Sequence, residues 1–141
     1  MRSVRIAYQG EPGAYSEAAS LQINPKAETI ACRAFEDVFE AVKTGSAAYG
    51  VLPIENTTAG SVYEAYDLLH RLNLSIVGEE IVDVRHCLLG VEGGTVEGLQ
   101  RVHSHPQGLA QCSEFLATLA GCEGISAANT ALAAKHVREL N

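Results

Sequence analysis

Polar and small residues are concentrated in three short segments of this 141-residue chain. The segments span residues 9 to 16, 55 to 61 and 104 to 111. Each lies between an apolar run typical of a buried strand and the expected start of a helix. In open α/β sheets, ligands bind outside the carboxyl ends of the strands, where loop amides and helix N-termini can hold negative groups. The three segments therefore predict a binding site for a small organic anion.

Glu55, at the start of the middle segment, is the obvious acid/base candidate. It follows the apolar run 51 to 54 and stands beside neutral hydrogen-bonding residues, so its carboxyl group suits proton transfer or the capping of a neighbouring amide. The other candidates are neutral hydrogen-bonding residues, and glycines that allow a ligand to approach the backbone. They are Gly10, Gly13, Asn56, Thr57, Thr58, Gly60, Ser61, Ser104 and Gln111. The chain has no GxxxxGK[ST] phosphate loop and no GxGxxG dinucleotide fingerprint.

The histidines and cysteines offer fewer sites. His105 precedes a proline that can start a helix, and it is either a catalytic base or a structural hydrogen-bonding residue. His103 and His105 would share one face of a strand, but no third or fourth ligand is apparent, and we predict no metal site. The four cysteines lack short metal-ligand spacings and are expected to be buried free thiols.

The overall charge narrows the class of partner. The formal net charge is −7 and the sequence pI is about 5.1, so a nucleic-acid partner, which needs a basic face, is not expected. No apolar run is long enough to cross a bilayer, and the start of the chain does not resemble a secretion signal. We therefore predict a cytoplasmic protein with no membrane contact.

The elements that must position these segments alternate between strands and helices in the first half of the chain. We expect strands at residues 4 to 8, 29 to 32 and 48 to 54, and helices at 15 to 23, 35 to 43 and 61 to 72. Gly45 is expected to end the second helix, and Ser61 to cap the third. This βαβαβα order implies a mostly parallel sheet with helices on its faces.

The second half begins with residues 74 to 91, which read as a long extended segment ended by Gly93 and Gly94. We then expect a short helix at 96 to 100, strands at 101 to 103 and 124 to 127, a helix at 106 to 119, and a last helix from Asn129 or Thr130 to about 140. The extended segment predicts a crossing between a first lobe, residues 1 to 75, and a second, residues 76 to 141.

The chain resembles the catalytic region of prephenate dehydratases and the related arogenate dehydratases. The resemblance covers the chain essentially from end to end. The matching stretches are Ala7–Ala19, Leu52–Ser61, Tyr66–Leu69, Ser104–Gln107 and Leu109–Cys112. The resemblance implies a two-lobed α/β fold of the periplasmic-binding-protein type II class, with mostly parallel sheets and a ligand cleft between the lobes. It also implies a homodimer that needs no cofactor.

The family chemistry implied by this resemblance converts prephenate to phenylpyruvate, with loss of the ring hydroxyl as water and of the ring carboxylate as CO2. Such a site needs orientation and electrostatics more than covalent catalysis. By motif, Asn56, Ser104 and Gln111 are expected to be catalytic, with Glu55 in the same loop. The expected substrate-binding residues are Gly13, Thr57, Thr58, Gly60, Ser61 and His105.

The chain also departs from the family pattern. It contains no Thr-Arg-Phe motif, whose threonine is the family's expected catalytic acid, and no phenylalanine-binding ACT domain. Gly108 replaces the usual alanine, and Asn129 replaces a common aspartate. We therefore interpret the chain as a C-terminally truncated prephenate dehydratase region. The alternatives are an arogenate dehydratase, a dicarboxylate-binding module without turnover, and an inactive fragment that dimerises over an exposed sheet edge.

Overall fold

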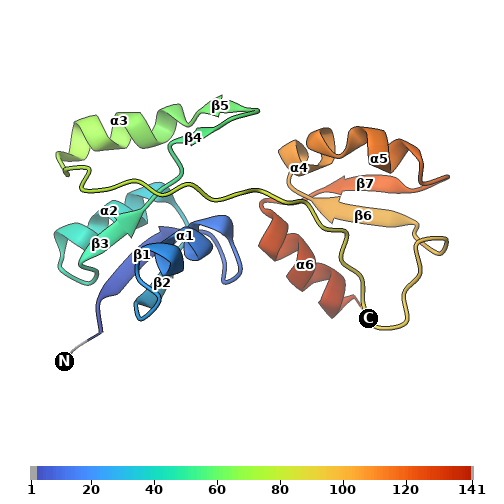
Figure 1. Cartoon of the computed structure of the whole chain (residues 1–141), viewed down its shortest axis with the longest axis horizontal. Helices are drawn as coiled ribbons and strands as arrows, with labels where there is room; N and C mark the ends of the chain where they lie inside the picture. Colours follow the sequence, from blue (N-terminus) through green and yellow to red (C-terminus); the bar gives the residue numbers. More distant parts are fainter. Residues whose placement is uncertain (1–2, 141) are drawn as a thin grey trace. The chain divides into compact units, whose positions relative to one another are not determined.

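The computed structural model describes residues 3 to 140, which form two compact α/β units. The first unit is Met1–Asp83 and the second is Val84–Asn141. In both units, parallel strands alternate with helices along the chain, as Figure 1 shows. The α/β class and the mostly parallel sheets are therefore confirmed.

The first unit is built on a three-stranded parallel sheet with the order β2-β1-β3. The strands are β1 (Arg5–Gln9), β2 (Glu28–Cys32) and β3 (Tyr49–Val51). β1 is the central strand, and its residues Ile6, Ala7 and Tyr8 are almost completely buried. This explains why these three consecutive residues are all apolar, because a central strand of a covered parallel sheet is buried on both faces.

Three helices follow the strands of this unit: α1 (Tyr15–Ile23), α2 (Phe35–Lys43) and α3 (Tyr63–Leu72). Val38 and Phe39 of α2 are buried in the core. The helix ends before Gly45, whose φ of +73° confirms the predicted C-terminal glycine. The close approach of α2 to β3 requires Gly50, since a Cβ there would lie 2.7 Å from Cγ1 of Val38.

The third strand is shorter than predicted, and a hairpin follows it. β3 ends at Val51, before Pro53, which has no backbone N–H to donate to a ladder. The chain then forms β4 (Glu55–Asn56) and β5 (Gly60–Ser61), which pair in an antiparallel ladder. The prediction that Ser61 caps the third helix was wrong, because Ser61 belongs to this ladder and Val62 occupies the N-cap position of α3.

The second unit contains a parallel pair, β6 (Arg101–Ser104) and β7 (Glu123–Ser126), with helices α4 (Pro106–Gln111), α5 (Ser113–Ala117) and α6 (Thr130–Glu139). The single helix predicted for residues 106 to 119 is in fact two, because Cys112 leaves the helical conformation with φ −102° and ψ 10°. Asn129 caps α6 as predicted, and its Oδ1 accepts a hydrogen bond of 2.7 Å from the N–H of Leu132.

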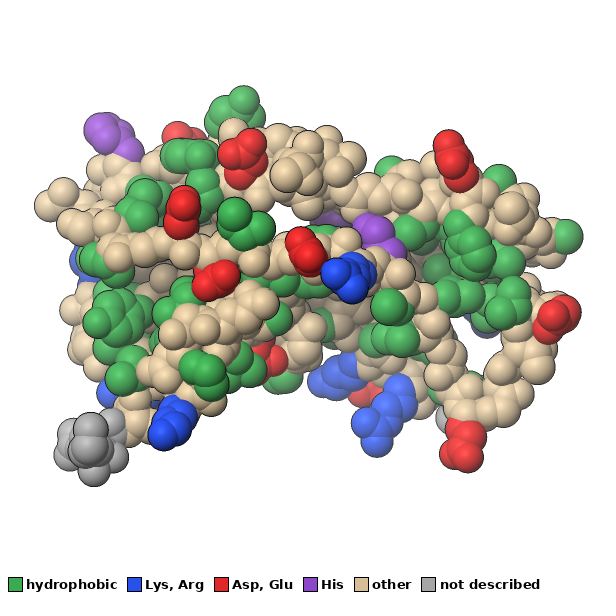
Figure 2. Space-filling model, in the orientation of Figure 1, with side chains coloured by type: hydrophobic (Ala, Val, Ile, Leu, Met, Phe, Trp, Pro, Cys, Tyr) green, Lys and Arg blue, Asp and Glu red, His purple; other side chains and the backbone are tan. Residues whose placement is uncertain are grey.

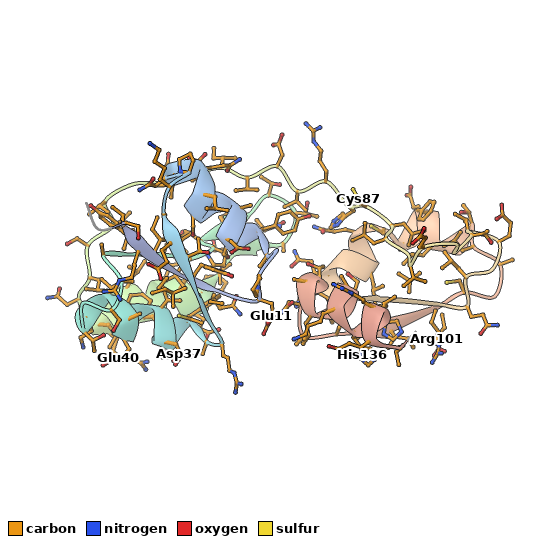
Figure 3. The ribbon with its side chains drawn as sticks, turned by 90° about the horizontal axis from the view of Figure 1, so that it is seen from below. Glu11, Asp37, Glu40, Cys87, Arg101 and His136 are labelled. Atoms are coloured by element: carbon orange, nitrogen blue, oxygen red, sulfur yellow. The ribbon has the colours of Figure 1, made fainter. Side chains whose placement is uncertain are left out.

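Residues 74 to 100 form no helix or strand, and Figure 1 draws them as a tube. The helix expected at 96 to 100 is only a turn, in which the N–H of Gly98 bonds to the carbonyl of Thr95. Ile76, Val77 and Ile81 are 68%, 77% and 82% exposed. Cys87, labelled on this segment in Figure 3, is also exposed, which corrects the prediction that all four cysteines are buried.

The distribution of charged side chains on the surface agrees with the formal net charge of −7. Acidic side chains are spread over the face shown in Figure 2. Among the residues that the structure describes, no helix is both long enough and apolar enough to cross a membrane.

Candidate functional site

The β4–β5 hairpin fixes the orientation of Asn56. Its Oδ1 accepts hydrogen bonds from the backbone N–H groups of Thr58 and Ala59, at 2.9 and 3.0 Å. Because backbone N–H groups can only donate, the side-chain atom that they meet must be the oxygen. The Nδ2 group of Asn56 is therefore the part of the amide that remains to donate to a ligand.

The remaining candidates of the middle segment surround this turn. Glu55 lies opposite Ser61 in the ladder, and Asn56 lies opposite Gly60. The φ of Gly60 is +83°, a conformation that residues with a Cβ rarely adopt. The side chains of Glu55, Thr57, Thr58 and Ser61 are exposed. The hairpin thus presents a carboxylate, three hydroxyl groups and one oriented amide to solvent.

Gly13 lies in the loop between β1 and α1, and Glu17 of α1 holds it in place. The Gly13 N–H donates to Oε2 of Glu17 at 2.7 Å, and the hydroxyl of Thr29 donates to Oε1 at 3.0 Å. Gly13 has a φ of +91°. The carboxylate of Glu17 therefore connects the loop to α1 and to strand β2. Sequence analysis missed this residue, although its position four residues after Gly13 at a helix start is a usable signal.

Tyr8 lies next to the same carboxylate. Burial, together with the charge of Glu17 and a hydrogen bond to it, raises the pKa of Tyr8 from 10.0 to about 12. The nearby charges of Glu11 and Cys32 act in the same direction. The hydroxyl group of Tyr8 therefore stays protonated and serves as a hydrogen-bonding group of the core.

The sheet brings the two candidate loops of the first unit to one edge. β1 and β3 are adjacent and parallel, so the Gly13 loop and the segment leading to Glu55 leave the sheet at the same end. Ligands bind at this carboxyl edge in open α/β sheets.

In the second unit, Ser104 ends β6 and His105 is the N-cap of α4. The Nδ1 atom of His105 accepts a hydrogen bond of 3.2 Å from the N–H of Gln107, as expected of a structural histidine. Gly108 lies in the first turn of the helix, and a Cβ at that position would approach Oγ of Ser104 to 2.8 Å. The glycine that departs from the family pattern therefore leaves room for the Ser104 hydroxyl against α4.

Gln111, the last residue of α4, contacts a residue that sequence analysis did not connect with it. Its Oε1 lies 2.8 Å from Nε2 of His86, and the donor of this hydrogen bond depends on the histidine tautomer. The two residues are 25 positions apart, and the segment that carries His86 has no regular structure, so no sequence periodicity indicates the contact.

The predicted site residues thus form two groups. Those in the first unit are Gly13, Glu55, Asn56, Thr57, Thr58, Gly60 and Ser61, and those in the second unit are Ser104, His105 and Gln111. The structure describes no cluster of three or more histidine, cysteine, aspartate or glutamate side chains placed to hold a metal ion.

Curated plant enzymes are similar to this chain in sequence. A 49% identical relative in Arabidopsis thaliana is named arogenate dehydratase/prephenate dehydratase 2, chloroplastic, and the match covers 95% of this chain and 35% of that protein. Arogenate dehydratase 2 of Petunia hybrida is 47% identical, with 95% and 34% covered. The chain thus spans about a third of the length of these curated relatives.

Two solved structures resemble the whole chain. One is described as a novel type of quorum quenching acylase; it is 40% identical with a TM-score of 0.87, over 96% of this chain and 50% of that one. The other is prephenate dehydratase from Arthrobacter aurescens in complex with L-Phe, with a TM-score of 0.75 and 23% identity, over 96% of this chain and 46% of that one. The second similarity confirms the predicted periplasmic-binding-like type II fold.

A sequence model of the family described as prephenate dehydratase matches residues 6–141. This match covers nearly the whole chain and agrees with the dehydratase relatives in plants. The chain therefore belongs to the prephenate dehydratase family, whose members act as dehydratases in aromatic amino acid biosynthesis.

Proposed function

We propose that this chain is a catalytic region that converts prephenate to phenylpyruvate. The family match over residues 6–141 carries the proposal. In the reaction, the bond between the ring and its carboxylate breaks and releases CO2, while the electron pair moves into the ring. The ring hydroxyl leaves with a proton as water, and aromatisation drives the step.

The geometry of the amides suits an anionic substrate. The oxygen of Asn56 is occupied by two backbone N–H groups, which leaves its Nδ2 hydrogens for a carboxylate. Gln111 likewise has its Oε1 within hydrogen-bond distance of another side chain. Pre-oriented donors stabilise negative charge without reorganisation during the reaction. In the first unit we assign substrate binding to the Asn56 amide, to the hydroxyl groups of the hairpin and to the loop glycines, with Glu55 as a further contact. In the second unit we assign it to the Gln111 amide and the Ser104 hydroxyl, with His105 as a further contact.

The proposal is tested by incubating the chain with prephenate near neutral pH and measuring phenylpyruvate. We expect product above the uncatalysed background, and we expect Asn56→Ala and Gln111→Ala to lose most of the rate. Calorimetric binding of prephenate without turnover would favour the binding-module alternative. If the folded chain neither binds prephenate nor converts it, the proposal is wrong.

Arogenate is the alternative substrate. Two of the Arabidopsis thaliana relatives carry both substrate names, whereas the Petunia hybrida relative is named for arogenate alone. The two substrates differ only in a keto or amino group on the side chain. A parallel assay with arogenate, compared by kcat/KM, decides between them. A higher value for arogenate would assign the chain to the other activity.

One comparison favours a second candidate function. The 40% identical structure is described as a quorum quenching acylase, so the chain is also a candidate for cleavage of an acyl amide. The same preparation should be assayed for release of the amine from an acylated quorum-sensing signal. Amide cleavage without phenylpyruvate formation would favour this second candidate.

We further propose that the protein is a homodimer located in the cytoplasm. The dimer is what the family resemblance implies, and light scattering of the purified chain gives its mass directly. The Arabidopsis thaliana relatives are named chloroplastic, so the compartment needs its own test, by imaging of the fluorescently tagged protein.

A further inference from the structure

His86 has a defined partner although it lies in a segment without regular structure. Its Nε2 atom is 2.8 Å from Oε1 of Gln111, at the end of α4. His86 itself is exposed, and Gln111 is partly buried. The hydrogen bond thus joins the segment to a helix of the same unit, at one of the residues assigned to substrate binding.

The polarity of this hydrogen bond decides what Gln111 presents to a ligand. If Nε2 of His86 carries the proton, it donates to Oε1, and the NH2 group of Gln111 remains free to donate. If Nε2 is unprotonated, the amide must turn and donate its own hydrogen to the ring, which leaves an oxygen facing the ligand. An amide oxygen repels a carboxylate, whereas the NH2 group binds it.

Asn56 provides an independent comparison within the chain. Its oxygen is fixed by two backbone N–H groups, which cannot reverse their roles. The first unit therefore presents an amide NH2 group by construction. In the second unit, Gln111 can present its NH2 group in the same way only if a donor holds its oxygen, and His86 is the side chain in contact with that oxygen.

We propose that His86 is a positioning residue that donates its Nε2–H to Gln111 and so fixes the Gln111 amide with its NH2 group toward the anionic substrate. The inference rests on the proposed function for the identity of the substrate. The direction of the hydrogen bond is a property of the free protein and is independent of the proposed function.

The polarity is tested by nitrogen-15 NMR of the His86 imidazole in the free chain. We expect a protonated Nε2 whose proton exchanges slowly, and faster exchange of that proton in Gln111→Ala. An unprotonated Nε2 in the wild-type chain would overturn the inference, whether or not the chain binds prephenate.

The effect on the ligand is tested by calorimetry with prephenate on four proteins: wild type, His86→Leu, Gln111→Ala and the double variant. We expect His86→Leu to weaken binding about threefold to tenfold, the range of one net hydrogen bond. In the Gln111→Ala background the same substitution should have no further effect, because the amide that it orients is gone. His86→Gln, which keeps a donor nitrogen, should restore most of the affinity.

The matched control is His70→Leu, which replaces an exposed histidine in the last turn of α3 in the other unit and should leave the affinity unchanged. The inference is overturned if the loss of affinity in the double variant equals the product of the two single losses, or if His86→Leu binds prephenate as tightly as the wild type. Either result would show that His86 only anchors its segment. If the wild-type chain binds no prephenate, the proposed function fails, and the NMR result alone decides the polarity.

Discussion

Removal of the charge of Glu17 should loosen the loop that carries Gly13. In Glu17→Gln, the amide oxygen can still accept the Gly13 N–H, and the NH2 group can still meet the Thr29 hydroxyl, so both contacts at 2.7 and 3.0 Å keep their geometry. The charge is lost, and the Thr29 hydroxyl changes from a donor to an acceptor. Hydrogen bonds to charged groups are roughly twice as strong as neutral ones, which gives a loss of about 1–2 kcal/mol for the two contacts. The melting temperature should fall by roughly 4–10 °C.

The same variant should change the titration of Tyr8. The pKa of about 12 should fall when the charge of Glu17 is removed, but should stay above 10.0, because burial is the largest cause of the increase. A folded-state pKa above the unfolded value means that the folded state loses stability as the pH rises from 10.0 through about 12. The variant, with a lower pKa, loses less, so its stability deficit should shrink over this range.

Tyr8 can be observed separately in an ultraviolet tyrosinate titration. The chain has five tyrosines, and Tyr8→Phe identifies the transition that belongs to Tyr8. Glu64→Gln is the matched control, because Glu64 is an exposed acid in the first turn of α3. Equal melting temperatures for Glu17→Gln and Glu64→Gln, with an unchanged Tyr8 transition, would refute the reasoning.

Three further predictions follow from packing, backbone conformation and thiol exposure. Gly50→Ala should destabilise the first unit by about 1–3 kcal/mol, since its Cβ would lie 2.7 Å from Val38, and chemical denaturation measures this. Gly60→Ala should cost about 1–2 kcal/mol because the φ of +83° is unfavourable for a residue with a Cβ, and should weaken protection of the hairpin amides in hydrogen exchange. Cys87, which is exposed, should be alkylated first, whereas Cys32, which is buried and has a raised pKa, should react last, as mass spectrometry will show. An unchanged denaturation midpoint in Gly50→Ala would contradict the first prediction, and unchanged protection of the hairpin amides in Gly60→Ala the second. Equal alkylation rates of Cys87 and Cys32 would contradict the third.

The regular elements were predictable from sequence where one physical cause dominates. The middle of β1, Ile6 to Tyr8, is apolar throughout because it is the central strand. In α2, apolar residues recur at helical spacing at positions 35, 38, 39 and 42 because one face packs against the core. Gly45 and Asn129 mark helix ends by their own chemistry.

The missed features depend on contacts that no local pattern records. The β4–β5 hairpin has two-residue strands, too short for an alternating pattern, and it depends on the turn made by Asn56. The break at Cys112 interrupts a sequence that has helical spacing on both sides. Glu17 and His86 act through partners 12 and 25 residues away, and such pairings become visible only in three dimensions.

We propose that the chain binds the dianion prephenate through amide NH2 groups held in a fixed orientation. Asn56→Asp tests this most directly, because aspartate keeps the oxygen that accepts from Thr58 and Ala59 and replaces only the NH2 group with a negative oxygen. In calorimetry with prephenate, we predict that the wild-type chain binds and that Asn56→Asp does not, while the melting temperature changes little. Equal prephenate affinity in the two proteins would show that the NH2 group of Asn56 does not bind the substrate.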